Sequence, residues 1–200
     1  MIAIIDYGMG NLRSVQKAFE KVGAKAIVTQ SSHDIKKAKK IVLPGVGAMQ
    51  PAMEKLQALG LLDPIKESIQ GKKPFLGICL GLQLLFETSD EGGSVKGLGI
   101  LKGRVQKFTS LKVPHMGWNQ LNIAKKCDLL KGLKDSTYLY FCHSYYVNPT
   151  DKNIVATTTD YGKPFTSCIC QDNILGVQFH PEKSQTVGLK ILENFTKLER

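Results

Sequence analysis

The chain has 200 residues, 42% of them hydrophobic, and a net charge of +10 at pH 7. This is enough apolar material for one well-buried core, so we expect a single domain over residues 1–200. The positive charge is nearly all lysine, with arginine only at Arg13, Arg104 and Arg200. Because arginine is the residue that grips phosphate bidentately and stacks on bases, a nucleic-acid-binding protein is not favoured.

The start of the chain and its cysteines further narrow the possible class of protein. Asp6 interrupts the apolar residues 1–5, so no signal peptide is predicted, and no apolar run reaches membrane-spanning length. We therefore expect a cytoplasmic protein. The five cysteines include no Cys-x-x-Cys pair, which argues against a disulfide framework or a zinc site. Cys168 and Cys170 are interpreted as reduced packing residues, with metal binding a remote alternative, and no cofactor is predicted.

The first part of the chain alternates between strand and helix patterns. Residues 2–5, 26–29 and 41–43 predict buried strands, and residues 14–22, 50–59 and 63–69 predict helices. This alternation indicates an α/β fold with an open, mostly parallel, doubly wound sheet flanked by helices. The lysine-rich residues 36–40 contain no aromatic side chain, so they favour a solvated helix face, although an acidic protein partner stays open.

Two glycine-containing turns follow the first and third predicted strands. Gly8 and Gly10 resemble the start of a dinucleotide-binding fingerprint, but Arg13 occupies the place of the third glycine, so no nicotinamide or flavin site is expected. Gly45 and Gly47 come at the carboxyl end of the third strand, where open α/β sheets place ligand-binding loops. A plain tight turn is the alternative for the second motif.

The periodicity of residues 74–86 changes at Cys79. The residues before it predict a short buried strand, and the apolar residues after it recur at helical spacing through residue 85. Gly77 and Gly81 flank the cysteine and permit a sharp turn, which is the nucleophile-elbow arrangement with cysteine in place of serine. The positive end of the following helix favours the thiolate form. A small, buried, unreactive cysteine is the alternative.

A candidate base lies near the other end of the chain. Residues 174–179 predict a strand that runs into His180, and Pro181 restricts the geometry of both residues. We expect His180 and Glu182 to project to the same side, with Glu182 orienting the imidazole. Cys79, His180 and Glu182 together make a constellation for nucleophilic catalysis.

The remaining segments are rich in strand patterns. Strands are predicted at residues 137–147, 154–158, 165–171 and 174–179, the last two joined as a hairpin, and a helix at residues 185–199. Residues 88–103 predict a loop near a site, since they are rich in glycine and polar side chains. Residues 113–119 hold the only tryptophan; Pro114 and Gly117 are expected to keep them from regular structure. From composition alone they are equally an interface anchor or a corner of the core.

These motifs, in this order, resemble the class I (triad) glutamine amidotransferase family over the whole chain. The resemblance rests on residues 44–47 (PGVG), 74–83 (PFLGICLGLQ), 114–119 (PHMGWN) and 180–183 (HPEK). It implies a flavodoxin-like sheet with added C-terminal antiparallel strands. It also implies hydrolysis of L-glutamine through a thioester on Cys79, with His180 and Glu182 completing the triad.

The expected site extends beyond the triad. We assign one oxyanion donor to the backbone N–H of Leu80 and the other to Val46 or Gly47, because a tetrahedral oxyanion on the cysteine needs such donors. In helical geometry Gln83 lies one turn beyond Cys79, where its amide could hold the substrate, although glutamine is also simply a good helix former. His143 is interpreted as structural. By resemblance, the substrate-binding residues are Gly47, Gln83, Glu91, Ser144 and Tyr145.

The resemblance is to a branch of the family in which the glutaminase works as a heterodimer with a (β/α)₈-barrel cyclase of histidine biosynthesis and passes ammonia to it. The residues that it implies for this interface are Asn11, Arg13, His115, Met116, Trp118, Asn119 and Lys183. Three alternatives stay open: a glutaminase for another synthase, such as one for sugar amidation; a non-catalytic scaffold; and a thiol protease or esterase. The intact triad argues against the scaffold, and the Leu-Gly-Leu-Gln continuation argues against the protease or esterase.

Overall fold

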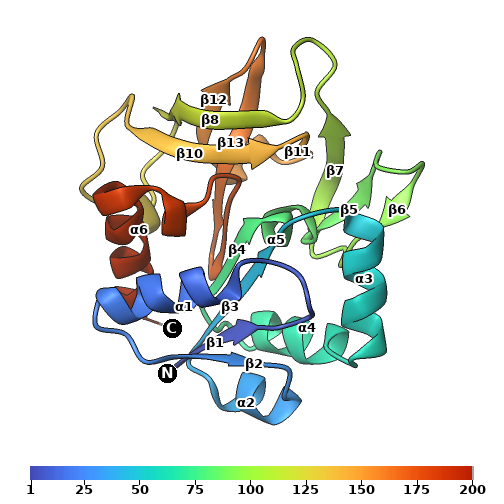
Figure 1. Ribbon diagram of the computed structural model, residues 1–200, viewed down its shortest axis with the longest axis vertical. Helices are drawn as coiled ribbons and strands as arrows, with labels where there is room; N and C mark the ends of the chain where they lie inside the picture. The colour runs from blue at the N-terminus through green and yellow to red at the C-terminus, as the bar shows by residue number, and fades with distance from the viewer. Residues whose placement is uncertain (200) are drawn as a thin grey trace.

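The computed structural model of the protein describes residues 1–199. Over this range, twelve strands form one sheet in the order β2-β1-β3-β4-β14-β13-β11-β7-β5-β6, with β12 paired to β13 and β9 paired to β12, and β8 and β10 form a separate two-stranded ribbon (Figure 1). The first strands are β1 (Ile2–Ile5), β2 (Ala26–Thr29), β3 (Lys40–Gly45), β4 (Phe75–Cys79), β5 (Phe86–Ser89), β6 (Val95–Lys96) and β7 (Leu101–Lys107). The others are β8 (His115–Gln120), β9 (Asn122–Ile123), β10 (Tyr138–His143), β11 (Tyr145–Pro149), β12 (Val155–Asp160), β13 (Pro164–Gln171) and β14 (Ile174–Val177).

Helices cover both faces of the parallel part of the sheet. The α-helices are α1 (Leu12–Lys21), α2 (Ser32–Lys37), α3 (Met49–Ala58), α4 (Leu62–Gln70), α5 (Leu80–Gln83) and α6 (Gln185–Lys197). Short 3₁₀ turns are η1 (Asp128–Leu130), η2 (Lys152–Ile154) and η3 (Pro181–Lys183). The Asn11 side chain caps α1 by accepting a hydrogen bond from the Ser14 N–H. No helix among the described residues is long and apolar enough to cross a membrane.

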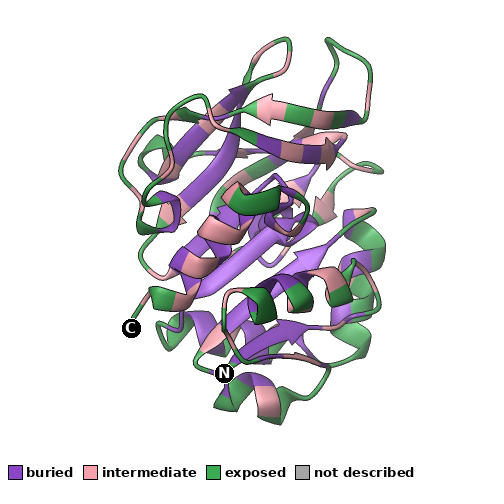
Figure 2. Ribbon diagram, turned by 60° about the vertical axis from the view of Figure 1, so that its left-hand side comes forward, coloured by how far each residue is buried: buried purple, intermediate pink, exposed green. Residues whose placement is uncertain are grey.

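Alternate side chains of the strands enter two separate cores. In β1, Ile2 and Ile4 pack with α1 and α6, whereas Ala3 and Ile5 pack with α2, α3 and α4. The central strands are buried along their whole length, as expected for a parallel sheet covered on both faces (Figure 2). This arrangement explains why their sequences read as continuous apolar runs, and it confirms the predicted α/β fold with an open sheet.

The sheet changes character at β14. Strands β2, β1, β3, β4 and β14 are parallel, and their carboxyl ends share one edge; Gly45 at the end of β3 pairs with Cys79 at the end of β4. The hairpin predicted across residues 172–173 joins β14 to β13, and antiparallel pairing continues from β13 to β11 and β7. The sheet is therefore mixed. Its parallel half carries the turn at Cys79, and its antiparallel half continues the sheet beside that turn.

Four local predictions were wrong. The strand predicted at residues 137–147 is broken at residue 144 into β10 and β11, which belong to different sheets. The helix after Cys79 ends at Gln83, and the chain turns directly into β5 instead of continuing through residue 85. Residues 88–103, expected as a loop, contain the end of β5, strand β6 and the start of β7. Residues 113–119 were expected to be irregular, but His115–Gln120 form β8, because they pair antiparallel with all of β10. For residues 88–103 and 115–120, strand pairing overrides the local signal from glycine, proline and polar residues.

Candidate active site

Cys79 stands on a strained turn between β4 and α5. Its backbone φ is 53°, in the left-handed region that a residue with a side chain rarely adopts. The flanking glycines make the turn possible: a Cβ on Gly81 would lie 1.7 Å from the Leu43 carbonyl oxygen, and one on Gly77 would lie 2.6 Å from the Gly81 carbonyl oxygen. The close approach of α5 to β3 and β4 therefore requires glycine at both positions, and it presents Cys79 at the carboxyl edge of the sheet.

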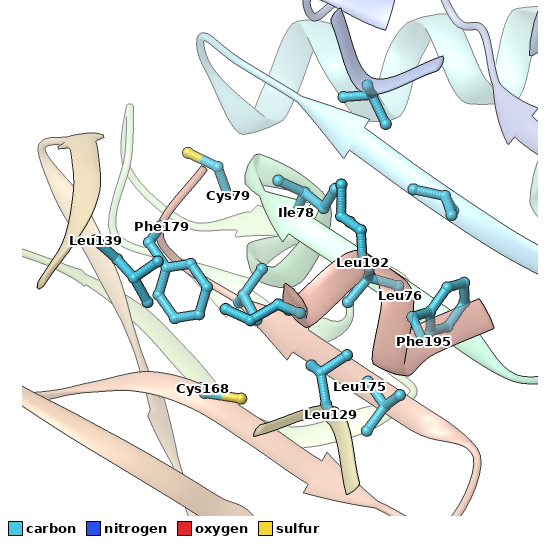
Figure 3. Packing of buried hydrophobic residues seen from close by; sticks show 14 of the residues in the cluster. Leu76, Ile78, Cys79, Leu129, Leu139, Cys168, Leu175, Phe179, Leu192 and Phe195 are labelled. Carbon is cyan, nitrogen blue, oxygen red and sulfur yellow. The ribbon is translucent and has the colours of Figure 1, made fainter. Parts of the chain in front are cut away.

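The Cys79 sulfur leaves the core and meets two polar groups. Figure 3 shows it directed away from the packed apolar side chains at the end of β4. The side chain of Gln178 donates from Nε2 to the sulfur at 3.5 Å, and the thiol lies 3.9 Å from the Cys142 carbonyl oxygen. Cys79 is only 5% exposed. The Cys79 side chain is thus held between the end of β14 and β10, with little of it exposed.

His180 and Glu182 form a buried pair directly after β14. The Nδ1 of His180 lies 2.8 Å from Oε1 of Glu182, and both side chains are 3% exposed. The backbone around the pair is fixed to β10, since the His180 N–H donates to the Tyr140 carbonyl and the Ser184 hydroxyl donates to the His180 carbonyl. Glu182 therefore fixes the ring orientation and assigns the proton to Nδ1 when the imidazole is neutral.

The charges around His180 favour its protonated form. Burial alone would lower the pKa of His180, but the Cys79 sulfur and the Glu182 carboxylate outweigh burial and raise it. The Nε2 of His180 is buried and makes no hydrogen bond within the described residues. This nitrogen is consequently free to exchange a proton with Cys79 or with a bound substrate.

A cavity of about 350 Å³ opens at Cys79. The predicted oxyanion and substrate-binding residues all line it, together with Cys79 itself: Val46, Gly47, Leu80, Gln83, Glu91, Ser144 and Tyr145. An open hollow of about 900 Å³ lies elsewhere, beside α2 and α6, but its lining is mostly lysine and aliphatic side chains, with Thr196 and Glu199, and contains neither cysteine nor histidine. The smaller cavity is therefore the candidate site, and its volume suits an amino-acid side chain with its α-carbon groups.

Two of the side chains that line the cavity, those of Gln83 and Glu91, already form hydrogen bonds with other residues of the chain. The Nε2 of Gln83 donates to the Tyr145 carbonyl oxygen at 2.9 Å and to Oε1 of Gln178 at 3.1 Å, so the amide nitrogen expected to hold the substrate is already committed. The Oε2 of Glu91 accepts a 2.7 Å hydrogen bond from the Met49 N–H at the start of α3. Glu91 thereby ties its loop to the end of the segment that carries Val46 and Gly47.

The buried hydroxyl of Tyr7 lies against Gly45, the last residue of β3. Tyr7 is 1% exposed and its hydroxyl has no hydrogen-bond partner among the described residues. A Cβ on Gly45 would lie 2.0 Å from this oxygen and 3.1 Å from the Leu80 Cβ, so only glycine fits there. Burial, with a contribution from Cys79, raises the pKa of Tyr7 and keeps the hydroxyl neutral.

The predicted partner residues divide into exposed and buried ones. Met116 and Trp118 are 61% and 46% exposed on one face of β8, and Asn11, Arg13 and Lys183 are also exposed. His115, by contrast, is 4% exposed and packs into the core. Its assignment to the partner surface was therefore wrong, because successive residues of a strand point to opposite faces. Asn119 is half-buried and points to the same inner side as His115.

The sequence did not indicate three groups around Cys79: the Gln178 side chain and the Cys142 carbonyl, which contact its sulfur, and the His143 ring, which lines the cavity. Gln178 carried a usable signal, since it is the one polar residue in the apolar run 174–179 and a fully buried amide must find partners. The other two depend on the break between β10 and β11 at residue 144 and had no local signal. The described residues contain no group of three or more His, Cys, Asp or Glu side chains suited to a metal ion.

Comparison with known proteins agrees with this geometry. The family described as "Glutamine amidotransferase class-I" matches residues 3–198. The chain belongs to the class-I glutamine amidotransferase family. A crystal structure described as a glutamine amidotransferase has the same fold, with a TM-score of 0.77, 18% sequence identity, and coverage of 98% of this chain and 100% of that one.

Curated relatives place the chain more narrowly. It is 53% identical over 98% of each chain to the imidazole glycerol phosphate synthase subunit HisH of Syntrophotalea carbinolica. It is 54% identical to the HisH subunit of Aquifex aeolicus, covering 97% of this chain and 95% of that one. Within the amidotransferases it is therefore a member of the HisH group.

Proposed function

We propose that this chain is the glutaminase subunit of an imidazole glycerol phosphate synthase in histidine biosynthesis. It hydrolyses L-glutamine to glutamate and passes the ammonia to the cyclase subunit HisF, a (β/α)₈ barrel that makes imidazole glycerol phosphate and AICAR. The observation that carries the proposal is the strained Cys79 at the cavity, with the buried His180–Glu182 pair beside it. The names of the HisH relatives support the pathway.

In the first half of the reaction the thiolate of Cys79 attacks the side-chain carbonyl carbon of glutamine. The carbonyl π electrons move to oxygen, and the oxyanion meets the backbone N–H of Leu80 and that of Val46 or Gly47. When the tetrahedral intermediate collapses, the C–N bond breaks and the leaving nitrogen takes a proton from Nε2 of His180. The products are ammonia and a thioester on Cys79.

In the second half a water molecule attacks the thioester. The neutral His180 accepts a proton from the water at Nε2, and the C–S bond breaks to release glutamate and the thiolate. Glu182 holds the ring through Nδ1 in both steps and stabilises the imidazolium each time it forms. Gly47, Glu91, Ser144 and Tyr145 are the groups that we assign to binding the α-carbon end of glutamine.

The product explains why a partner is needed. At neutral pH free ammonia is mostly ammonium, which is not a nucleophile, so the amine must reach its acceptor before it is protonated by water. We assign the exposed Met116 and Trp118 to the surface that receives the cyclase, because aromatic and methionine side chains are enriched in interface cores. Both subunits are expected in the cytoplasm.

The test is glutamate release from glutamine, measured for the chain alone and with the cyclase and its nucleotide substrate. We expect release that rises on adding the cyclase and is abolished in Cys79→Ala, whereas Cys127→Ala, a cysteine outside the cavity, retains it. Release that survives loss of Cys79, or no release under any condition, would refute the catalytic proposal. Strong release that does not respond to the cyclase would refute the assignment to histidine biosynthesis.

A further inference from the structure

A hydrogen-bonded chain crosses the interior from the β8–β10 ribbon to the cavity wall. The Nδ2 of Asn119 lies 3.2 Å from Nε2 of His115, and Nδ1 of His115 lies 3.0 Å from Nε2 of His143. Nδ1 of His143 lies 2.7 Å from the Tyr145 carbonyl oxygen. The four groups come from β8, β10 and β11, and the chain ends where the backbone leaves the ribbon for the main sheet (Figure 1).

Only one arrangement of protons satisfies this chain. The amide nitrogen of Asn119 can only donate and the carbonyl oxygen of Tyr145 can only accept. His115 therefore accepts at Nε2 and donates from Nδ1, and His143 does the same. The amide of Asn119 is itself fixed, because its nitrogen also donates to the Asp160 carbonyl at 2.8 Å and its oxygen accepts from the Gln120 N–H at 2.8 Å.

The surroundings hold both rings in place and keep them neutral. His115 is stacked between Tyr161 and Phe141, with ring centroids 4.1 Å and 5.0 Å away. Phe165 contacts both histidines, with centroids 5.8 Å from His115 and 5.2 Å from His143. Burial lowers the pKa of His115 to about 4, and burial, with smaller effects of the neighbouring histidines, lowers that of His143 to about 3. A proton added to either ring would set two donors face to face and break the chain.

The far end of the chain reaches the nucleophile. The Tyr145 carbonyl oxygen that receives His143 also receives the Gln83 amide at 2.9 Å. Gln83 in turn binds Oε1 of Gln178, whose Nε2 donates to the Cys79 sulfur. One backbone oxygen therefore fixes the position of the amide that spans the cavity wall and, through it, of the amide that holds the thiol.

Resting on the proposed glutaminase function, we propose that Asn119, His115 and His143 form a positioning relay for the glutamine site. The relay fixes the orientation of the Tyr145 carbonyl. This oxygen binds the Gln83 amide, and Gln83 in turn positions the Gln178 amide beside Cys79. These residues take no part in bond making. They hold the cavity wall against which glutamine binds. The first of them, Asn119, directly follows Trp118, whose side chain lies on the exposed face of the ribbon.

Histidine ring tautomers give a test that needs no activity. In long-range ¹H–¹⁵N spectra of the whole protein near pH 7, we expect both rings as the Nδ1–H tautomer, with signals assigned from single histidine variants. An Nε2–H tautomer or a protonated ring at either position would overturn the proposal. Because this measurement is independent of glutamine, the relay can be judged even if the proposed function fails.

Kinetics with the cyclase present test the positioning role. Loss of the hydrogen bond in His143→Leu leaves the Tyr145 carbonyl short of a donor, and we expect KM for glutamine to rise about tenfold or more. His143→Asn places a donor where Nδ1 was, so it should keep KM close to the parent value. A purely structural role would lower Tm in both variants without separating their KM values. The exposed His33→Leu is the matched control and should change nothing.

A variant at the surface end removes the remaining ambiguity, because His143 itself borders the cavity. Asn119 does not line the cavity, and Asn119→Leu removes the first donor of the relay together with the hydrogen bonds to the backbone of Asp160 and Gln120. We expect a rise in KM of about threefold, with His115 no longer held as the Nδ1–H tautomer. If His143→Leu does not fold, this variant decides the matter. Folded relay variants with parental KM and kcat would overturn the proposal.

Discussion

The sharpest test of the triad assignment is Glu182→Gln. This change keeps the size of the side chain but removes the charge from the 2.8 Å contact with His180, where both side chains are 3% exposed. A hydrogen bond to a charged group contributes about 1.5–3 kcal/mol and a neutral one about 0.5–1.5 kcal/mol, so the variant loses about 1–2 kcal/mol of support for the imidazolium. At about 1.4 kcal/mol per factor of ten, kcat should fall about 5- to 30-fold. KM for glutamine should not change, because Glu182 does not line the cavity.

The same change should alter the pH dependence in a defined direction. Glu182 and Cys79 raise the pKa of His180 against the opposing effect of burial, so the protonated ring persists until the pH passes that raised value. The stability that this pairing gives is complete below the ordinary histidine pKa of about 6.5 and is lost as pH rises through the raised one. Without the carboxylate the pKa of His180 falls, and the alkaline limb of the kcat profile should move to lower pH.

The assay is glutamate release followed with glutamate dehydrogenase across pH 6 to 10, with the cyclase saturating; this range brackets the unperturbed histidine pKa of about 6.5 and the region above it. Glu20→Gln, an exposed change on α1, is the matched control and should leave both kcat and the profile unchanged. A higher KM with unchanged kcat, or an alkaline limb that does not move, would show that Glu182 does not support His180 in the way we infer.

Two further predictions concern the partner surface and the core. Trp118→Ala should weaken binding of the cyclase about 30-fold, which corresponds to a hot spot of about 2 kcal/mol. Tm should change little, because the side chain is 46% exposed. Isothermal titration calorimetry compares this variant with the exposed control Leu59→Ala, and equal affinities of the two variants would place the interface elsewhere. Phe195→Ala removes a fully buried ring whose centroid lies 6.0 Å from that of Phe19. The free energy of unfolding should fall by about 3–5 kcal/mol, which lowers Tm by roughly 6–20 °C. A fall in Tm no larger than that of the exposed control Leu111→Ala would contradict the core assignment.

The parallel half of the fold was predictable because its signals are local. Apolar runs buried on both faces mark β1, β3 and β4, and the glycines around Cys79 mark the elbow. The ribbon was not predictable, because Pro114 and Gly117 suggest a loop while β8 pairs with β10, a separate segment that begins at Tyr138. Once that pairing is known, the alternation of exposed Met116 and Trp118 with buried His115 follows from the pleat alone.

The sequence indicated which residues gather at the candidate site but not the contacts that they make there. The predicted oxyanion and substrate residues line one cavity, since they follow strands whose carboxyl ends share an edge. What the sequence could not supply is the set of partners that each polar group finds, such as the Tyr145 carbonyl that engages Gln83. Those contacts depend on the break between β10 and β11, and hydrogen-bond partners of buried amides are decided by tertiary structure rather than by neighbours in the sequence.

The left-handed turn at Cys79 has a consequence for laboratory evolution of this enzyme. A cysteine held at φ 53° costs about 1–3 kcal/mol relative to a relaxed backbone, and glycine would recover much of that energy. Variants selected only for thermal resistance thus gain by discarding the nucleophile. A lineage that keeps cysteine there forgoes this gain in stability, which makes position 79 a direct indicator of whether the lineage is still under selection for catalysis.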